Sequence, residues 1–277
     1  MRSVSADLLV LRKRTSTWVL LGVWVLLGVT FAYLLPYATY HSEGRGGTGE
    51  SLPIMLPENL VANVLALFPV YGGVFALMLG ILAVGSDYGW GTIKTVLTQR
   101  SGRLRVLASK LAAVYVILVV FVLAMFVAGA TGAYAIASIE GAKVSWPKAP
   151  DLVEALAAGW FLFAIWAATG VGVAVLSKGT ALAIGLGVLY ALVLESILTA
   201  VADQVSWLAG VVEYSIRANA YSIVAALGVP AAVLGDNGPG GFFGPFVGAG
   251  QAMVVLCAYA GFFMIVGGAV FVRRDVG

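Results

Sequence analysis

The sequence predicts an all-α membrane protein, and three observations lead to this prediction. Of its 277 residues, 61% are hydrophobic and only 10% are charged, whereas soluble domains carry about 25% charged residues. Six apolar windows are each long enough for a helix to cross a hydrocarbon core about 30 Å thick. These windows are twice the length of barrel strands, which span about ten residues, and show none of their polar–apolar alternation.

The predicted spans cover residues 18–37, 64–85, 111–137, 156–176, 181–202 and 251–272. Five contain no charged side chain, and the fifth along the chain contains one, Glu195. The first is too long for a cleaved signal peptide and lacks a cleavage site. We therefore expect one transmembrane domain over residues 1–277.

The distribution of basic residues predicts the orientation. With the N-terminus inside, only four of the 16 Lys and Arg residues fall outside: Arg45, Lys143, Lys148 and Arg217. Because Lys and Arg favour the cytoplasmic side, we expect a multi-pass protein of the plasma or inner membrane with both termini cytoplasmic. The net charge of +3 then indicates contact with lipid headgroups and no nucleic-acid partner. The expected membrane-surface anchors are Arg12, Lys13, Arg14, Arg103, Arg105, Lys110, Arg273 and Arg274.

Three segments outside the spans have recognisable patterns. Residues 3–14 predict an amphipathic elbow helix with Leu8 and Leu11, and Leu9 beside them, toward lipid. An unstructured basic tail is the alternative. Residues 203–250 predict one or two short helices at the outer membrane surface, followed by an irregular hairpin. A seventh span there is disfavoured by Glu213, Arg217 and Asn219. The third span is longer than a bilayer requires, so we expect it to tilt or project.

The basic segment 87–105 predicts a short cytoplasmic helix. Asp87 stands where it can cap a helix N-terminus. Trp90, Ile93, Val96 and Leu97 recur on one helical face, and Ser101-Gly102 ends the helix. This apolar face fits a groove on a partner protein; a membrane-surface helix without a partner is the alternative.

The sequence lacks the residue patterns that several kinds of catalytic or metal site require. No Gly-rich phosphate loop ending in Lys-Ser/Thr is present, and His41 is the only histidine. A serine protease needs a base beside its nucleophile, and a zinc site needs several ligands. Cys257 is the only cysteine, so no intramolecular disulfide forms. We expect a non-catalytic chain that holds no cofactor or metal.

The segment from Asp87 to Lys110 resembles the coupling-helix region of type-2 ABC-transporter permeases. The similar positions are Asp87, Gly91, Thr92, Ile93, Val96, Leu97, Ser101, Arg103 and Lys110. The basic pair and acid after the last span, Arg273-Arg274-Asp275, resemble the end of those chains. Asp87 stands where Glu is more usual, and Gln99-Arg100 stands where a Pro often precedes the Ser. The motif covers about 25 residues, while the expected topology agrees over the whole chain.

This resemblance implies an exporter permease that works as a homo- or heterodimer. Two copies of a separate ABC ATPase subunit would bind ATP and Mg and dock on the coupling helix. The residues implied in that contact are Asp87, Trp90, Gly91, Thr92, Ile93, Val96, Leu97 and Arg100. A different class of function is also open, namely a membrane anchor or scaffold subunit without transport of its own.

Glu195 is the one acid predicted inside a span. An ionised acid at the bilayer centre costs about 2.5–3.5 kcal/mol on insertion scales, so Glu195 requires a partner or water. One interpretation places it on a translocation path or at a dimer seam. The other makes it a structural acceptor for outer-loop backbone or a partner of Arg217.

Overall fold

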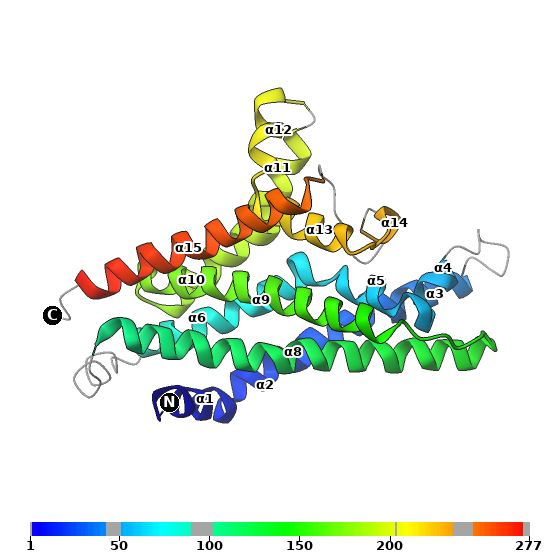
Figure 1. The fold of residues 1–277 in the computed structure, drawn as a ribbon, viewed down its shortest axis with the longest axis horizontal. Helices are drawn as coiled ribbons and strands as arrows, with labels where there is room; N and C mark the ends of the chain where they lie inside the picture. Colours follow the sequence, from blue (N-terminus) through cyan, green and yellow to red (C-terminus); the bar gives the residue numbers. More distant parts are fainter. Residues whose placement is uncertain (1, 43–50, 90–101, 203, 235–245, 274–277) are drawn as a thin grey trace.

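The computed structural model describes residues 2–42, 51–89, 102–202, 204–234 and 246–273 (Figure 1). Within them, six helices are long and apolar enough to cross a membrane: Thr15–Ser42, Phe68–Gly89, Arg103–Glu140, Ala149–Ser177, Thr180–Ala202 and Ala249–Arg273. Each one overlaps a predicted window. The described residues contain no strand, and the prediction of an all-α, multi-pass membrane protein is confirmed.

Short segments precede, interrupt and connect these spans. The first span combines α2 (Thr15–Val29), the π-helical turn η1 (Thr30–Leu34) and α3 (Leu35–Ser42), and it follows α1 (Arg2–Lys13). The second combines the π-helical turn η3 (Phe68–Gly72) with α6 (Gly73–Gly89). Three short elements precede it: α4 (Ser51–Met55), the 3-10 turn η2 (Pro57–Asn59) and α5 (Leu60–Leu65).

The later spans complete the bundle. The third and fourth are α8 (Arg103–Glu140) and α9 (Ala149–Ser177). The fifth combines α10 (Thr180–Val188), the π-helical turn η4 (Leu189–Leu194) and α11 (Glu195–Ala202). The last is α15 (Ala249–Arg273), preceded by α12 (Ser206–Val212), α13 (Ile216–Ala226) and α14 (Ala231–Leu234).

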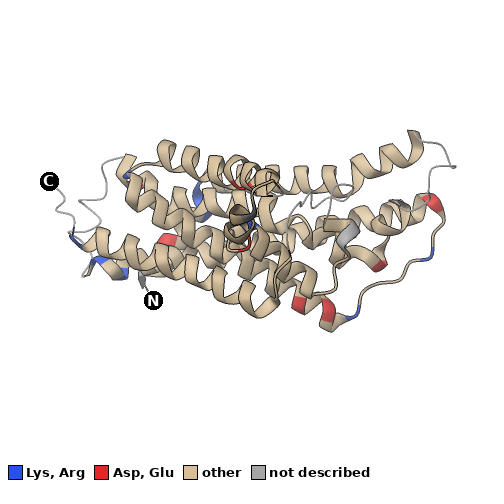
Figure 2. Ribbon diagram, turned by 90° about the horizontal axis from the view of Figure 1, so that it is seen from above, with Lys and Arg blue, Asp and Glu red and all other residues tan. Residues whose placement is uncertain are grey.

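The long helices run along one another, and both chain ends lie at the same end of the bundle (Figure 1). Many Lys and Arg residues lie toward that end, whereas the opposite end carries acidic residues together with a few basic ones (Figure 2). The 38 residues of α8 extend over about 57 Å at 1.5 Å per residue. This helix is therefore longer than a bilayer requires, as its sequence predicts.

The centre of the bundle is the pair formed by α6 and α9. A Cβ atom on Gly80 would collide with the backbone oxygen of Ala167, and one on Gly170 would collide with that of Leu77. The missing side chains thus let the two backbones approach closely, which is how small residues promote packing between membrane helices. The Trp166 indole also donates to the Pro69 oxygen at 2.7 Å.

Burial divides the spans into inner and outer helices. In the most apolar windows of the second and fourth spans, 78% of residues are buried, against 22% in the first and fifth and 28% in the last. The outer helices expose large apolar side chains, among them Leu26 on α2, Leu189 on η4 and Ile265 on α15. Such a surface fits hydrocarbon better than water.

The segment between the last two spans contains short helices, as predicted. One of them, α13, is buried from Ile216 to Val224 and packs against α15, η3 and α9, which its sequence did not predict. Asn219 is accommodated because its amide donates to the carbonyl oxygens of Glu213, at 2.8 Å, and Ser215, at 2.7 Å. At 11 residues, or about 16 Å, α13 is too short to form a seventh span. Of the predicted hairpin, residues 235–245 lie outside the described residues.

The N-terminal segment is helical, as its amphipathic pattern predicts, but its apolar face points differently. Leu11 is only 3% exposed because α1 packs along α8. Leu9, in contrast, is 53% exposed. The expectation that Leu11 faces lipid was wrong, since periodicity cannot distinguish a face packed on protein from one packed on lipid.

Candidate functional site at the ends of the predicted coupling segment

Most of the predicted coupling residues lie outside the described residues: Trp90, Gly91, Thr92, Ile93, Val96, Leu97 and Arg100. The two helices that carry this segment are described. α6 ends at Gly89, and α8 begins at Arg103 after Gly102, whose φ is 91°. The structure therefore defines how the ends of the segment are held.

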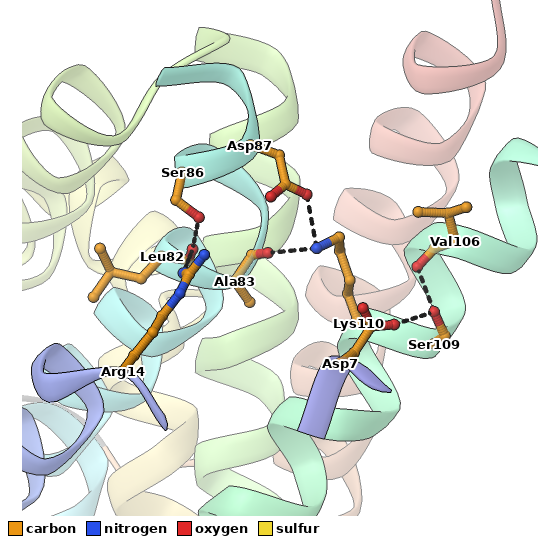
Figure 3. A network of polar contacts seen from close by, with 9 residues as sticks. All are labelled: Asp7, Arg14, Leu82, Ala83, Ser86, Asp87, Val106, Ser109 and Lys110. Atoms are coloured by element: carbon orange, nitrogen blue, oxygen red, sulfur yellow. Dashed lines mark hydrogen bonds and ion pairs between the residues drawn. The ribbon is translucent and has the colours of Figure 1, made fainter. Parts of the chain in front are cut away.

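An ion pair joins these two helices. Lys110 Nζ lies 2.7 Å from Asp87 Oδ2, and the side chains are only 12% and 9% exposed. The Lys110 ammonium also donates to the Ala83 oxygen at 3.2 Å (Figure 3). Asp87 thus lies in the last turn of α6 and pairs with the next span, whereas the sequence suggested a cap for the following helix. Lys110, expected as a headgroup anchor, points into the bundle.

A second contact attaches α1 to the same place. The Ser109 hydroxyl, next to Lys110 in sequence, lies 2.6 Å from Asp7 Oδ2 (Figure 3). Asp7 is 7% exposed. A hydrogen bond to a charged group is stronger than one between neutral groups. Asp7 therefore fixes α1 against the start of α8.

Arg14, the residue that separates α1 from α2, provides a third contact. Its guanidinium donates to the Leu82 oxygen of α6 at 2.8 Å. Burial lowers the pKa of Arg14, while the nearby negative charge of Asp87 acts in the opposite direction. We call Asp7, Arg14, Asp87, Ser109 and Lys110 the polar cluster. It holds two acids and two bases, so its formal charges balance.

The other expected anchors are found in varied settings. Arg12, Lys13 and Arg105 are exposed, as is Arg273 at the end of α15. Arg103 donates to the Val272 oxygen at 2.8 Å, which links the start of α8 to the end of α15. Arg274 lies outside the described residues. The start of α8 therefore contacts α1, α6 and α15.

Glu195 belongs to a separate site between η4 and α13. Its Oε1 accepts hydrogen bonds from the Tyr190 hydroxyl at 2.8 Å and from the backbone N–H groups of Ile216 and Arg217 at 3.0 and 3.4 Å. Glu195 is 1% exposed. Because a helix N-terminus carries partial positive charge, the carboxylate stabilises the start of α13. This geometry agrees with the interpretation of Glu195 as a structural acceptor for backbone N–H groups.

Sequence reasoning missed three members of these sites, Asp7, Ser109 and Tyr190. Asp7 is the one acid among residues 1–42, which was a usable signal. Ser109 and Tyr190 resemble many other residues of the spans, so only the structure identifies them. Among the described residues, no group of three or more His, Cys, Asp and Glu could hold a metal ion.

A family model described as a protein of unknown function (DUF2705) matches residues 25–277. No curated protein matches the chain.

Proposed function

We propose that this chain, which belongs to the DUF2705 family, is the non-catalytic permease subunit of an ATP-driven exporter. It would form the translocation path with a second permease chain, in the plasma or inner membrane, with both termini cytoplasmic. Two ATPase subunits, which bind ATP and Mg, would dock on the coupling segment. The family leaves function open, so the proposal rests on the sequence of residues 87–110 and on how their ends are held.

The Asp87–Lys110 pair is the observation that carries the proposal. A segment that receives force must pass it to the helices on both sides. The ion pair joins the last turn of α6 to the beginning of α8, and Asp7 and Arg14 attach the N-terminal helix to the same point. A displacement of the coupling segment would thus move three helices together.

Capture of the ATPase tests the proposal. With a candidate ATPase subunit co-expressed, Trp90→Ala combined with Leu97→Ala is expected to remain in the membrane and lose co-purification of the ATPase. The matched control is Trp207→Ala with Leu189→Ala, which removes the same residue types from positions 72% and 53% exposed. Undiminished co-purification by the Trp90 and Leu97 variant would contradict the proposal.

A simple observation distinguishes the exporter permease from the alternative, a membrane scaffold subunit. An exporter requires a partner with a nucleotide-binding loop, so an adjacent reading frame that encodes one favours the permease. Proteins that co-purify in detergent without such a subunit favour the scaffold.

A further inference from the structure

A half-open cavity of about 490 Å³ lies among α6, α9, α10, η4 and α15. Its size is that of pockets which bind small molecules. It is separate from the polar cluster and adjoins the Glu195 site only through Tyr190. The lining residues are Leu77, Thr169, Val173, Leu176, Ser177, Leu182, Leu186, Gly187, Tyr190, Tyr259 and Phe263.

The cavity wall suits a hydrocarbon. Most of its lining side chains are aliphatic or aromatic. The Thr169 hydroxyl already donates to the Ile165 oxygen at 3.0 Å, and the Ser177 hydroxyl to the Val173 oxygen at 2.8 Å. These hydroxyl protons are therefore engaged within α9, and a polar ligand would lose its hydrogen bonds to water with little in return.

The cavity is open toward the surroundings of the bundle. Leu176, Leu182 and Leu186 line it and are 37%, 58% and 49% exposed. They belong to two of the candidate spans, so the medium outside them is expected to be lipid. A molecule already present in the bilayer can enter without crossing water.

The two ends of the cavity differ. Leu182 lies beside the turn between α9 and α10, where Lys178 is exposed. Tyr190 lies eight residues further along the same span, about 12 Å away. There Tyr190 donates to Glu195, and the Tyr259 hydroxyl lies near enough to interact with that of Tyr190. The polar groups at the Tyr190 end are therefore engaged with one another.

We propose that this cavity binds one acyl chain of a membrane phospholipid. The headgroup lies at the α9–α10 turn, where the Lys178 ammonium attracts the phosphate, and the methyl end points toward Tyr190 and Tyr259. This inference does not depend on the exporter proposal, because lipid binding needs neither an ATPase nor transport.

Photolabelling in lipid nanodiscs tests the position and direction of the chain. The probes are two phosphatidylglycerols, one with a diazirine near the acyl carbonyl and one with a diazirine at the chain end. Peptide mass spectrometry is expected to map the first label to Leu176 and Leu182 and the second to Tyr190, Tyr259 and Phe263. Reversed positions, or labels spread evenly over the exposed faces of the spans, would overturn the proposal.

Filling the cavity tests its role directly. Val173→Phe is expected to displace about two methylene groups of the acyl chain. The amount of phosphatidylglycerol retained after detergent exchange should then fall about tenfold. Native mass spectrometry measures that retention. The matched control on the same helix is Val153→Phe, at a position 66% exposed and outside the cavity.

A second pair of variants keeps the lipid-retention test valid if the Val173→Phe protein fails to fold. Leu186→Trp covers the open side of the cavity, while Leu189→Trp enlarges a neighbouring leucine that is 53% exposed and does not line it. Loss of the lipid in Leu186→Trp alone supports the proposal. Equal retention in both variants, or equal loss in both, refutes it.

Discussion

At the scale of residues, the polar cluster shows how charged groups are accommodated beside apolar spans. Asp87 and Lys110 come from different helices and are both largely buried. Buried ion pairs add little net stability over apolar residues of similar size, but the loss of one partner leaves an uncompensated charge. The pair therefore matters chiefly for which helices it brings together.

A double-mutant cycle tests this ion pair. Asp87→Asn is expected to lower the free energy of unfolding by up to about 3 kcal/mol, since Lys110 loses its counter-charge. Lys110→Met is the other single variant of the cycle. Asp87→Asn combined with Lys110→Met should restore much of the loss, because no charge is then buried. Thermal unfolding in detergent provides the measurement. Glu154→Gln, at an exposed position, is the control, and strictly additive effects would contradict the coupling.

Glu195 permits a second test at this scale. Glu195→Gln keeps an acceptor oxygen for the Ile216 N–H, so its stability should remain near that of the unchanged protein. Glu195→Ala leaves the buried N–H groups of α13 without this acceptor and should cost about 1–3 kcal/mol. If Glu195→Gln unfolds as easily as Glu195→Ala, the charge itself is required. Transport lost in a stable Glu195→Gln protein would instead favour the translocation-path interpretation.

At the scale of elements, close approach of backbones holds the centre of the bundle together. α6 and α9 meet through Gly80 and Gly170, and each glycine lies against a carbonyl group of the other helix. A backbone atom cannot move aside as a flexible side chain can. This contact is thus more sensitive to added volume than contacts elsewhere on the spans.

Gly80→Ala is expected to destabilise the protein by about 1–3 kcal/mol, because one methyl group overfills the contact with Ala167. The matched control is Gly261→Ala in α15, where an added Cβ meets no atom within 4 Å. The yield of monodisperse protein on size-exclusion chromatography measures the difference. Equal yields of the two variants would show that α6 and α9 are not in close contact.

The sequence predicted elements better than their packing. Six spans follow from the length of apolar runs, because the bilayer sets one thickness for all of them. The pairing of α6 with α9 was not predictable, since small residues such as Gly129 and Gly187 occur in other spans too. The burial of α13 was missed because Arg and Asn side chains are mostly exposed to water in proteins, whereas the structure supplies Arg217 and Asn219 with protein partners.

At the scale of the whole molecule, the distribution of charge and the position of the termini agree with each other. Both chain ends lie at the end where many Lys and Arg residues lie (Figure 2). By the positive-inside rule, we predict that this end is cytoplasmic. Labelling with a membrane-impermeant thiol reagent in intact cells checks this assignment.

The labelling starts from a Cys257→Ala background, which removes the natural thiol. A cysteine placed at Lys143 should react in intact cells, and one placed at Lys13 should react only after lysis. Both positions are exposed in the structure, so accessibility within the protein does not favour either. The reverse result would invert the proposed topology.

The length of α8 has a mechanical consequence. Its first turns are fixed to α1, α6 and α15, and about 57 Å of continuous helix extend from there to Glu140, which accepts a hydrogen bond from Tyr37 at 2.8 Å. A rigid rod of that length which pivots by roughly ten degrees at one end moves its far end by about 10 Å. A small rotation beside the polar cluster would therefore be amplified into a large displacement at the opposite end of the molecule.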